Sequence, residues 1–242
     1  MEDFLIAIPA RISSTRLPEK PLRTLKGKPL IGWVVEACLK ITKNVLVATD
    51  DEKIKEVAEN FGAKAVLTSK NHKSGTDRIF EAVKDLPFKY IVNVQGDEPF
   101  VKSFHVLSIV DALERGEQFA TIATHFSLEE EVKDPNNVKV VIDRNSYAIY
   151  FSRSVIPFPR DGKLTVSNYL KHVGIYGYTK EALEKFVSWD EGFLEKIEKL
   201  EQLRIIENGC KIKVSIVEEP TFGIDTEEDL KKALEKLEKG EV

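Results

Sequence analysis

Short apolar runs recur in the first half of the chain, and each is bounded by polar residues. Residues 4–8 (FLIAI), 44–49 (NVLVAT) and 89–94 (KYIVNV) have apolar centres without strict alternation. This pattern is typical of strands buried on both faces of a parallel sheet. Residues 63–68 (AKAVLT) form a fourth run of this kind. The first half therefore predicts several parallel strands.

Stretches with helical spacing of apolar residues separate these runs. Pro29 suits the first turn of one helix, and residues 51–62 indicate a surface helix that ends at Gly62. A further helix is predicted to begin near Thr76. This alternation predicts an α/β fold, an open and mostly parallel sheet with helices on both faces. Ligands bind such sheets at the carboxyl ends of the strands.

The second half of the chain has a different pattern. Residues 137–152 contain two β-rich runs around a polar turn, which predicts an antiparallel hairpin. Further strands are predicted over residues 171–179 and 211–219, and residues 196–209 predict a single amphipathic helix stopped by glycine. The sheet is therefore expected to be mixed, with an antiparallel insertion. Because no Pro/Gly/Ser-rich linker or repeat occurs, we expect residues 1–242 to form one domain.

Composition narrows the class of protein. The 242 residues are 42% hydrophobic and 31% charged, which is the balance of a soluble globular protein. The net charge of −4 argues against a nucleic-acid partner. Cys38 and Cys210 form no CxxC pair, so neither a zinc site nor a disulfide framework is indicated. Pro9 interrupts the apolar start, and no run is long enough to span a membrane, so we expect a cytoplasmic protein without membrane insertion.

Basic residues are concentrated after the first predicted strand. Residues 7–22 (AIPARISSTRLPEKPL) contain Arg11, Arg16 and Lys20 but a single acid, Glu19. With the hydroxyls of the Ser-Ser-Thr run and exposed backbone N–H groups, these cations are suited to enclosing a polyphosphate. The glycine patterns of the P-loop and of the dinucleotide fold are absent. A solvated turn that keeps its charges in water explains the composition equally well.

Two aspartates lie where strands are predicted to end. Asp97 follows the strand over residues 89–94, within QGDEP, and Asp225 follows another predicted strand, within GIDT. Carboxylates from two such positions are suited to hold one Mg²⁺, which binds one or two carboxylates together with water and substrate phosphates. Two structural explanations are open. Asp97 suits a turn, and Asp225 or Thr226 suits the cap of a helix over residues 226–237.

The segment KSGTDR is a second candidate for anion binding. Ser74 and Gly75 are placed to present backbone N–H groups at the positive end of the predicted helix, and Arg78 lies in its first turn. A capped helix with Arg78 in solvent is the alternative explanation.

Eight segments, in this order, resemble the sugar-activating nucleotidyltransferases, and most specifically the family of cytidylyltransferases that act on 3-deoxy-D-manno-octulosonate (Kdo). They are IPARISSTRLPEKPL, GKPLI, HKSGTDRI, VNVQGDEP, SRSVIPFPR, KHVGIYGY, LEQLRIIENG and GIDTEEDL. Together they span nearly the whole chain. Members that act on sialic acid or on isoprenoid precursors share the opening loop but not QGDEP.

The resemblance implies a fold and a reaction. The fold is a three-layer, nucleotide-diphosphosugar-transferase-like (Rossmann-like) α/β fold with a mixed, mostly parallel sheet and an antiparallel insertion. The reaction transfers CMP from CTP to the anomeric 2-hydroxyl of Kdo by direct displacement, with Mg²⁺ as cofactor, and gives pyrophosphate and CMP-Kdo for lipopolysaccharide synthesis. A homodimer is implied as well. Within the single domain, residues 1–120 would bind the nucleotide, residues 121–222 the sugar and the second subunit, and residues 223–242 would hold a metal residue and the C-terminal helix.

The same resemblance implies roles for individual residues. Catalysis is expected of Lys20, Arg11, Asp97 and Asp225, and the two aspartates are the expected Mg²⁺ ligands. The expected nucleotide-binding residues are Pro9, Ala10, Arg11, Ser13, Ser14, Lys20, Ser74, Gly75, Arg78, Gln95 and Asp97. The expected sugar-binding residues are Gln95, Arg153, His172, Tyr176, Glu201 and Gln202.

Without the resemblance, the residues allow several assignments for the sugar site. The cations that could hold the sugar carboxylate are Arg153, Arg160, Lys171 and His172. A histidine such as His172 is also common as a satisfied structural residue, and Tyr176, in alternation with Tyr178, suits core packing. Glu201 and Gln202 suit sugar hydroxyls but also the solvated face of a helix.

Three other functions fit parts of the pattern. A cytidylyltransferase for another acidic sugar, such as sialic acid, would share the opening loop. A non-catalytic nucleotide-binding module would retain that loop, but binding alone rarely requires the carboxylate pair of Asp97 and Asp225. A glycosyltransferase would place an Asp-x-Asp motif where GDEP stands.

Overall fold

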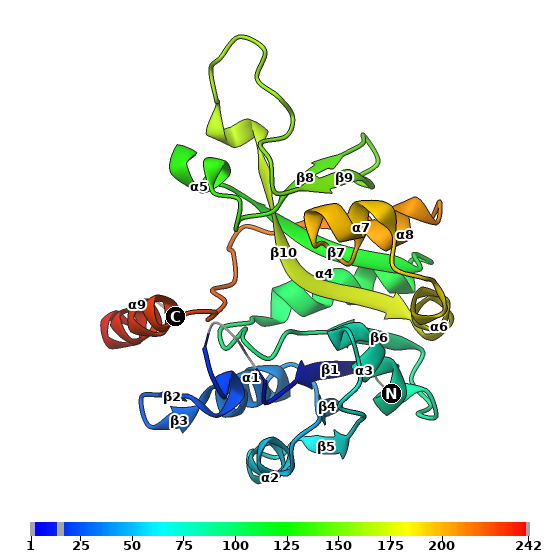
Figure 1. The fold of residues 1–242 in the computed structure, drawn as a ribbon, viewed down its shortest axis with the longest axis vertical. Helices are drawn as coiled ribbons and strands as arrows, with labels where there is room; N and C mark the ends of the chain where they lie inside the picture. The colour runs from blue at the N-terminus through cyan, green and yellow to red at the C-terminus, as the bar shows by residue number, and fades with distance from the viewer. Residues whose placement is uncertain (1–2, 14–16, 241–242) are drawn as a thin grey trace. The chain divides into compact units, whose positions relative to one another are not determined.

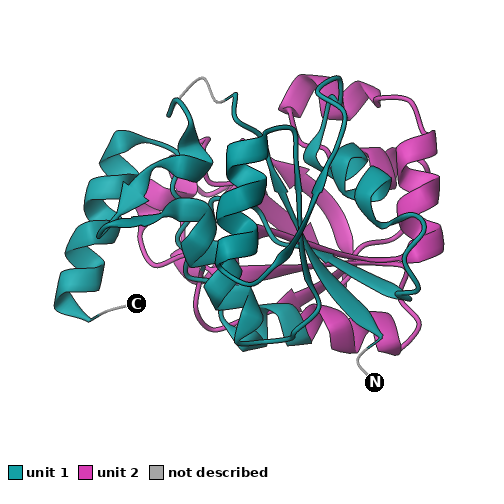
Figure 2. Ribbon diagram, turned by 90° about the horizontal axis from the view of Figure 1, so that it is seen from below, with its two compact units in different colours: residues 1–107, 221–242 teal, residues 108–220 magenta. Residues whose placement is uncertain are grey.

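The computed structural model describes residues 3–13 and 17–240. The chain divides into two compact units, coloured separately in Figure 2. Unit 1 contains residues 1–107 and 221–242, and unit 2 contains residues 108–220.

The sheet strands of unit 1 are parallel and follow the order β6-β1-β4-β5. Their bounds are Phe4–Ala10 (β1), Val45–Thr49 (β4), Lys64–Leu67 (β5) and Tyr90–Asn93 (β6). Ile6 of β1 stands opposite Val45 of β4 and Val92 of β6, and all three side chains are buried. The four parallel strands predicted from apolar runs are confirmed. Their carboxyl ends share one edge of the sheet, where the loops that follow them meet.

Helices and a small two-stranded sheet complete unit 1 (Figure 1). Their bounds are Leu30–Leu39 (α1), Glu52–Asn60 (α2), Gly75–Val83 (α3), Glu227–Lys239 (α9), Lys20–Leu22 (the 3₁₀ helix η1), Thr24–Leu25 (β2) and Lys28–Pro29 (β3). The helices predicted from apolar spacing are confirmed. Helix α4 (Ser103–Glu114) begins in unit 1 and ends in unit 2.

The predicted strand before Asp225 is wrong, because residues 221–225 form no regular element. Apolar packing and hydrogen bonds to distant residues place this segment instead. The Ile224 amide donates to the Asp97 carbonyl at 2.9 Å. A small core joins the segment and α9 to the start of the chain; its buried members are Leu17, Leu25, Leu30, Ile224 and Ala233. The C-terminal segment is therefore built into unit 1.

Unit 2 carries the antiparallel part of the fold. Its strands are Phe119–His125 (β7), Lys139–Ile142 (β8), Ala148–Ser152 (β9), Leu170–Thr179 (β10) and Lys213–Ile216 (β11). Strands β11 and β7 pair in parallel, whereas β7–β10, β10–β8 and β8–β9 pair antiparallel. Its helical elements are Glu129–Lys133 (α5), Val166–Asn168 (the 3₁₀ helix η2), Lys180–Ser188 (α6), Phe193–Glu198 (α7) and Leu203–Glu207 (α8). The predicted hairpin over residues 137–152 is confirmed.

The single helix predicted over residues 196–209 is wrong. The segment forms α7 and α8, because Lys199 adopts a left-handed conformation with φ of 54° and ends α7. A buried ion pair stabilises the break. Arg204 of α8 donates from Nε and Nη2 to the carboxylate of Glu195 of α7, at 2.8 and 2.6 Å. Apolar spacing continues through both helices, so the sequence pattern does not reveal the break.

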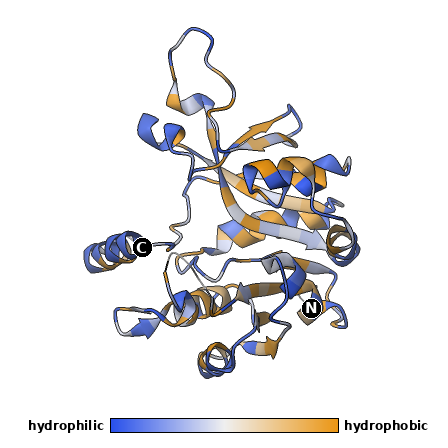
Figure 3. Cartoon of the chain, in the orientation of Figure 1, coloured by the Kyte–Doolittle hydropathy of each residue, from blue (hydrophilic) through white to orange (hydrophobic). Residues whose placement is uncertain are grey.

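The α/β fold with a mixed, mostly parallel sheet, flanking helices and an antiparallel insertion is confirmed. Figure 3 shows that the residues of α9 are mainly hydrophilic, and Ala233 is buried. Among the described helices, none is both long and apolar enough to cross a membrane.

Candidate active site

A cavity of about 360 Å³ in unit 1 gathers most of the residues predicted to bind a nucleotide. The end of β1 and the loop after it supply Pro9, Ala10, Arg11, Ser13 and Lys20. The start of α3, the loop after β6 and the segment before α9 supply Ser74, Gly75, Arg78, Gln95, Asp97 and Asp225. Ser14 lies outside the described residues. His72 and Lys73 also line the cavity, although the sequence analysis gave them no role.

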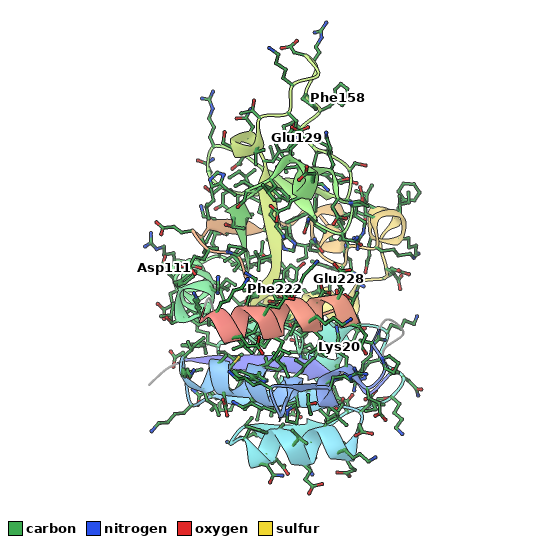
Figure 4. All side chains as sticks on the ribbon, turned by 90° about the vertical axis from the view of Figure 1, so that its left-hand side faces the viewer. Lys20, Asp111, Glu129, Phe158, Phe222 and Glu228 are labelled. Carbon is green, nitrogen blue, oxygen red and sulfur yellow. The ribbon has the colours of Figure 1, made fainter. Side chains whose placement is uncertain are left out.

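Lys20 joins the two aspartates. Its ammonium lies 2.5 Å from Oδ2 of Asp97 and 2.8 Å from Oδ1 of Asp225 (Lys20 is labelled in Figure 4). Burial by itself lowers the pKa of Lys20, but the two carboxylates outweigh it, so the pKa is raised above its usual value. The ammonium is therefore charged at neutral pH. The two carboxylates come from distant parts of the sequence and converge on one ammonium.

Local structure explains how these groups meet. Glu19, with φ of 52°, turns the chain into η1, so that Lys20 begins this short helix. Arg23 pairs with Glu227 of α9 at 2.5 Å and ties the loop to the C-terminal helix. Asp97 follows β6, at the carboxyl edge of the sheet.

The alternative explanation by helix capping applies to Thr226 and not to Asp225. Thr226 Oγ1 accepts from the amide of Asp229 at 3.1 Å, and Asp229 Oδ2 accepts from the amide of Thr226 at 2.9 Å. This capping box satisfies the start of α9. Asp225 contacts Lys20 instead. The turn expected at Asp97 is also present, because the amide of Glu98 donates to the carbonyl of Gln95 at 3.1 Å.

Two glycines bring backbone close to the end of β1. A Cβ at Gly96 would lie 2.9 Å from the carbonyl oxygen of Pro9, and a Cβ at Gly75 would lie 3.2 Å from the Pro9 ring. The first distance leaves no room for a side chain, so glycine lets the Asp97 loop lie against β1.

The segment KSGTDR caps a helix and lines the cavity. Ser74 Oγ accepts from the amide of Asp77 at 3.1 Å, as the capping explanation predicts. The alternative explanation of a solvated Arg78 is wrong, because this residue is only 3% exposed. Its guanidinium donates to Thr68 Oγ1 at 2.6 Å and to Asp50 Oδ2 at 3.0 Å.

The carboxylates of Asp97 and Asp225 suit a hard cation that takes its remaining ligands from the substrate. Asp97 and Asp225 present carboxylate oxygens to the same ammonium, so the same oxygens are close enough to share one ion. Among the described residues, no group of three or more His, Cys, Asp or Glu side chains is placed to hold a metal ion. Two carboxylates in the wall of this cavity fit Mg²⁺, which takes its other ligands from water and phosphates.

Unit 2 brings together three of the residues predicted to bind the sugar. The rings of His172 and Tyr176 lie 5.4 Å apart, and the charge of Glu201 acts on the Tyr176 hydroxyl. Burial lowers the pKa of His172 to about 3, so the ring is neutral at physiological pH. Its Nε2 contacts Thr121 Oγ1 at 3.1 Å. Burial also raises the pKa of Tyr176.

The other predicted sugar-site residues are arranged differently. Gln202 is 4% exposed, and its Nε2 has no hydrogen-bond partner among the described residues. Neither Gln202 nor the half-buried Glu201 therefore lies on a solvated helix face. Arg153 donates to the carbonyls of Glu198 and Pro135. The remaining members are Arg160, exposed in a loop, Lys171, half-buried in β10, and Gln95, which belongs to unit 1. Tyr178 packs in the core against Phe119 and Phe186, as alternation predicts.

Comparison with known proteins gives consistent relatives over the whole chain. Residues 5–213 match the family model described as cytidylyltransferase. The chain is 43% identical to the 3-deoxy-manno-octulosonate cytidylyltransferase of Fusobacterium nucleatum over 244 residues, 99% of this chain and 98% of that protein. The enzyme of the same name from Thermodesulfovibrio yellowstonii is 46% identical, over 95% of this chain and 96% of that protein.

A solved structure is similar over the same length. It is that of CMP:2-keto-3-deoxy-manno-octonic acid synthetase complexed with CTP. It superimposes with a TM-score of 0.90 at 38% identity, over 99% of both chains.

Proposed function

The chain belongs to the cytidylyltransferase family, and we propose that it activates Kdo: it transfers CMP from CTP to the 2-hydroxyl of the sugar and releases pyrophosphate. The observation that carries this proposal is the convergence of Lys20, Asp97 and Asp225 in a cavity lined by the opening loop and the start of α3. The names of the relatives, which act on Kdo, supply the substrate.

The chemistry is a direct displacement at phosphorus. The sugar oxygen forms a bond to the α-phosphorus of CTP, the bond to the pyrophosphate oxygen breaks, and the hydroxyl proton is released. Negative charge grows on the leaving pyrophosphate. Lys20 and Arg11 would stabilise that charge as fixed cations, and Lys20 is protonated throughout the neutral range because its pKa is raised. Amides around Ser74 and Gly75, at the N-terminus of α3, would hold phosphate oxygens.

Asp97 and Asp225 would hold Mg²⁺, which draws negative charge from phosphate oxygens when bound. The two carboxylates already face a cation, the Lys20 ammonium, so the site is built to hold positive charge.

Sugar recognition would use the cluster in unit 2. The neutral imidazole of His172, the Tyr176 hydroxyl and Glu201 offer donors and acceptors for hydroxyl groups. The unpaired Nε2 of Gln202 is a buried donor, whose desolvation a sugar oxygen would offset. Arg153 and Gln95 complete the set we assign to the sugar.

We further propose that residues 1–120 bind the nucleotide, residues 121–222 bind the sugar, and residues 223–242 hold a metal residue and the C-terminal helix. We also propose that the protein is a homodimer and that unit 2 forms the interface. Apolar side chains exposed on this unit support the dimer. Ile149 of β9 is 56% exposed, and Phe158, in the loop after β9, is 82% exposed (Figure 4). We place the reaction in the cytoplasm, as a step that prepares Kdo for lipopolysaccharide synthesis.

Pyrophosphate release from CTP tests the proposal. Wild-type protein is expected to release pyrophosphate only when Kdo and Mg²⁺ are both present, and EDTA should stop the reaction. Asp97→Asn should abolish release, while Asp111→Asn, at an exposed residue of α4, should retain it. Undiminished turnover in the Asp97 variant would refute the assigned site.

A further inference from the structure

Asp50 lies directly after β4, at the carboxyl edge of the parallel strands of unit 1. Its side chain is 8% exposed. Oδ1 accepts from the amide of Ile12 at 3.1 Å, and Oδ2 accepts from Nη2 of Arg78 at 3.0 Å. Asp50 is not one of the described residues that line the cavity. The contacts that connect Asp50 to the cavity are therefore those of its two partners.

One partner, Arg78, lines the cavity, and the other, Ile12, lies in the loop that does. Ile12 stands between Arg11 and Ser13, which line it, in a part of the opening loop without regular structure. Such a loop has no helical or sheet ladder to hold it, so the bond to Asp50 restrains its backbone directly.

Arg78 lines the cavity from helix α3, and its guanidinium is bound at two points. Its Nη1 donates to Thr68 Oγ1 at 2.6 Å, and Thr68 Oγ1 in turn donates to the carbonyl of Thr49 at 2.9 Å. With Nη2 bound to Asp50, the planar guanidinium is fixed in orientation as well as position. One carboxylate thus holds a loop and a helix that face the same space.

The next residue shows what a purely structural aspartate does here. Asp51 Oδ1 accepts from the amides of Lys53 and Ile54, at 2.9 and 3.2 Å, and caps α2. Asp51 stabilises a helix, whereas Asp50 joins two ligand-facing segments. The pair therefore supplies a matched internal control.

We propose that Asp50 is a positioning residue for the nucleotide, which sets the distance between the opening loop at Ile12 and the guanidinium of Arg78. This inference rests on the proposed function, since it takes CTP as the occupant of the cavity.

Asp50→Asn and Asp51→Asn test the inference when CTP binding is measured by calorimetry and kcat and KM are measured separately. Asparagine keeps an oxygen acceptor but loses the charge, so Arg78 loses its ion-pair partner. We expect the Kd and KM for CTP to rise about tenfold or more in Asp50→Asn, the size of one lost charge-assisted hydrogen bond. The KM for Kdo should stay near its wild-type value. Asp51→Asn should leave the Kd for CTP unchanged, and its melting temperature should stay near that of the wild type because asparagine also caps helices.

Each outcome decides a different claim. If both variants bind CTP like the wild type, Asp50 has only a structural role and the inference is wrong. If the wild type itself binds no CTP, the proposed function fails and the inference fails with it. Should Asp50→Asn not fold, Asp50→Glu keeps the charge but adds a methylene that displaces both partners. A rise of about threefold or more in the Kd for CTP is then expected, and an unchanged Kd overturns the positioning role.

Discussion

Replacement of Lys20 by methionine removes the one positive charge between Asp97 and Asp225 and keeps most of the side-chain volume. The two carboxylates are then left facing each other, about 5 Å apart at most, because Nζ lies 2.5 and 2.8 Å from them. At an effective dielectric constant of about 20, two charges at this distance repel by about 3 kcal/mol. Solvent screens part of this repulsion, since Asp225 is 41% exposed.

We therefore expect Lys20→Met to lose about 1–2 kcal/mol of stability, measured by urea unfolding at pH 7. The catalytic effect should be larger. Loss of a fixed cation from a charge-stabilising site costs on the order of a hundredfold in rate, so kcat for pyrophosphate release should fall by at least that factor. Lys26→Met, at an exposed position of the same segment, is the matched control and should change neither quantity.

Two results would refute this reasoning. Turnover of folded Lys20→Met within about threefold of the wild type would show that the ammonium does not stabilise the reaction. A variant more stable than the wild type would show that the carboxylates do not repel as calculated.

Three further outcomes follow from the structure. Because burial lowers the pKa of His172 to about 3, the unfolded chain binds a proton below about pH 6.5 that the folded chain does not, so this residue destabilises the fold as pH falls from 6.5 toward 3. Between pH 7 and pH 5 the wild type should lose about 2 kcal/mol more than His172→Gln in urea unfolding, and equal losses would contradict the burial argument. Thr226→Ala removes the cap of α9 and should cost about 1 kcal/mol by thermal unfolding, with an unchanged melting temperature as the contrary result. Gly96→Ala places a Cβ 2.9 Å from the Pro9 carbonyl and should cost about 1–3 kcal/mol, whereas Gly174→Ala, with open space around it, should cost less; equal stability of the two variants would disprove the close approach.

Much of unit 1 could be predicted from the sequence, because its signals are local. Buried parallel strands give continuous apolar runs, and the loops after them carry the chemistry, as at Asp97. The capping box of Thr226 was also predictable from spacing, since both of its partners lie within one helical turn.

What could not be predicted depends on contacts between distant residues. The segment before Asp225 was expected to be a strand, but a long-range hydrogen bond and a small core hold it in place. The break at Lys199 depends on the ion pair between Glu195 and Arg204, which apolar spacing does not encode.

The role of Asp50 belongs to the same class. The available signal was a pair of aspartates at the end of a buried strand, of which one caps the next helix. Only the fold brings the other to Ile12 and to Arg78, which was predicted to bind the nucleotide. Local sequence pattern therefore predicts the residues that line the cavity, but not the residues that hold them in position.

The central claim is that the protein activates Kdo. A competition between Kdo and sialic acid, with the product identified, tests this claim most directly. The protein is incubated with CTP, Mg²⁺ and equal concentrations of Kdo and sialic acid, and the nucleotide sugars are identified by mass spectrometry. Our account predicts CMP-Kdo, with CMP–sialic acid absent or a minor product. CMP–sialic acid as the main product, or CTP left intact beside both sugars, would contradict it.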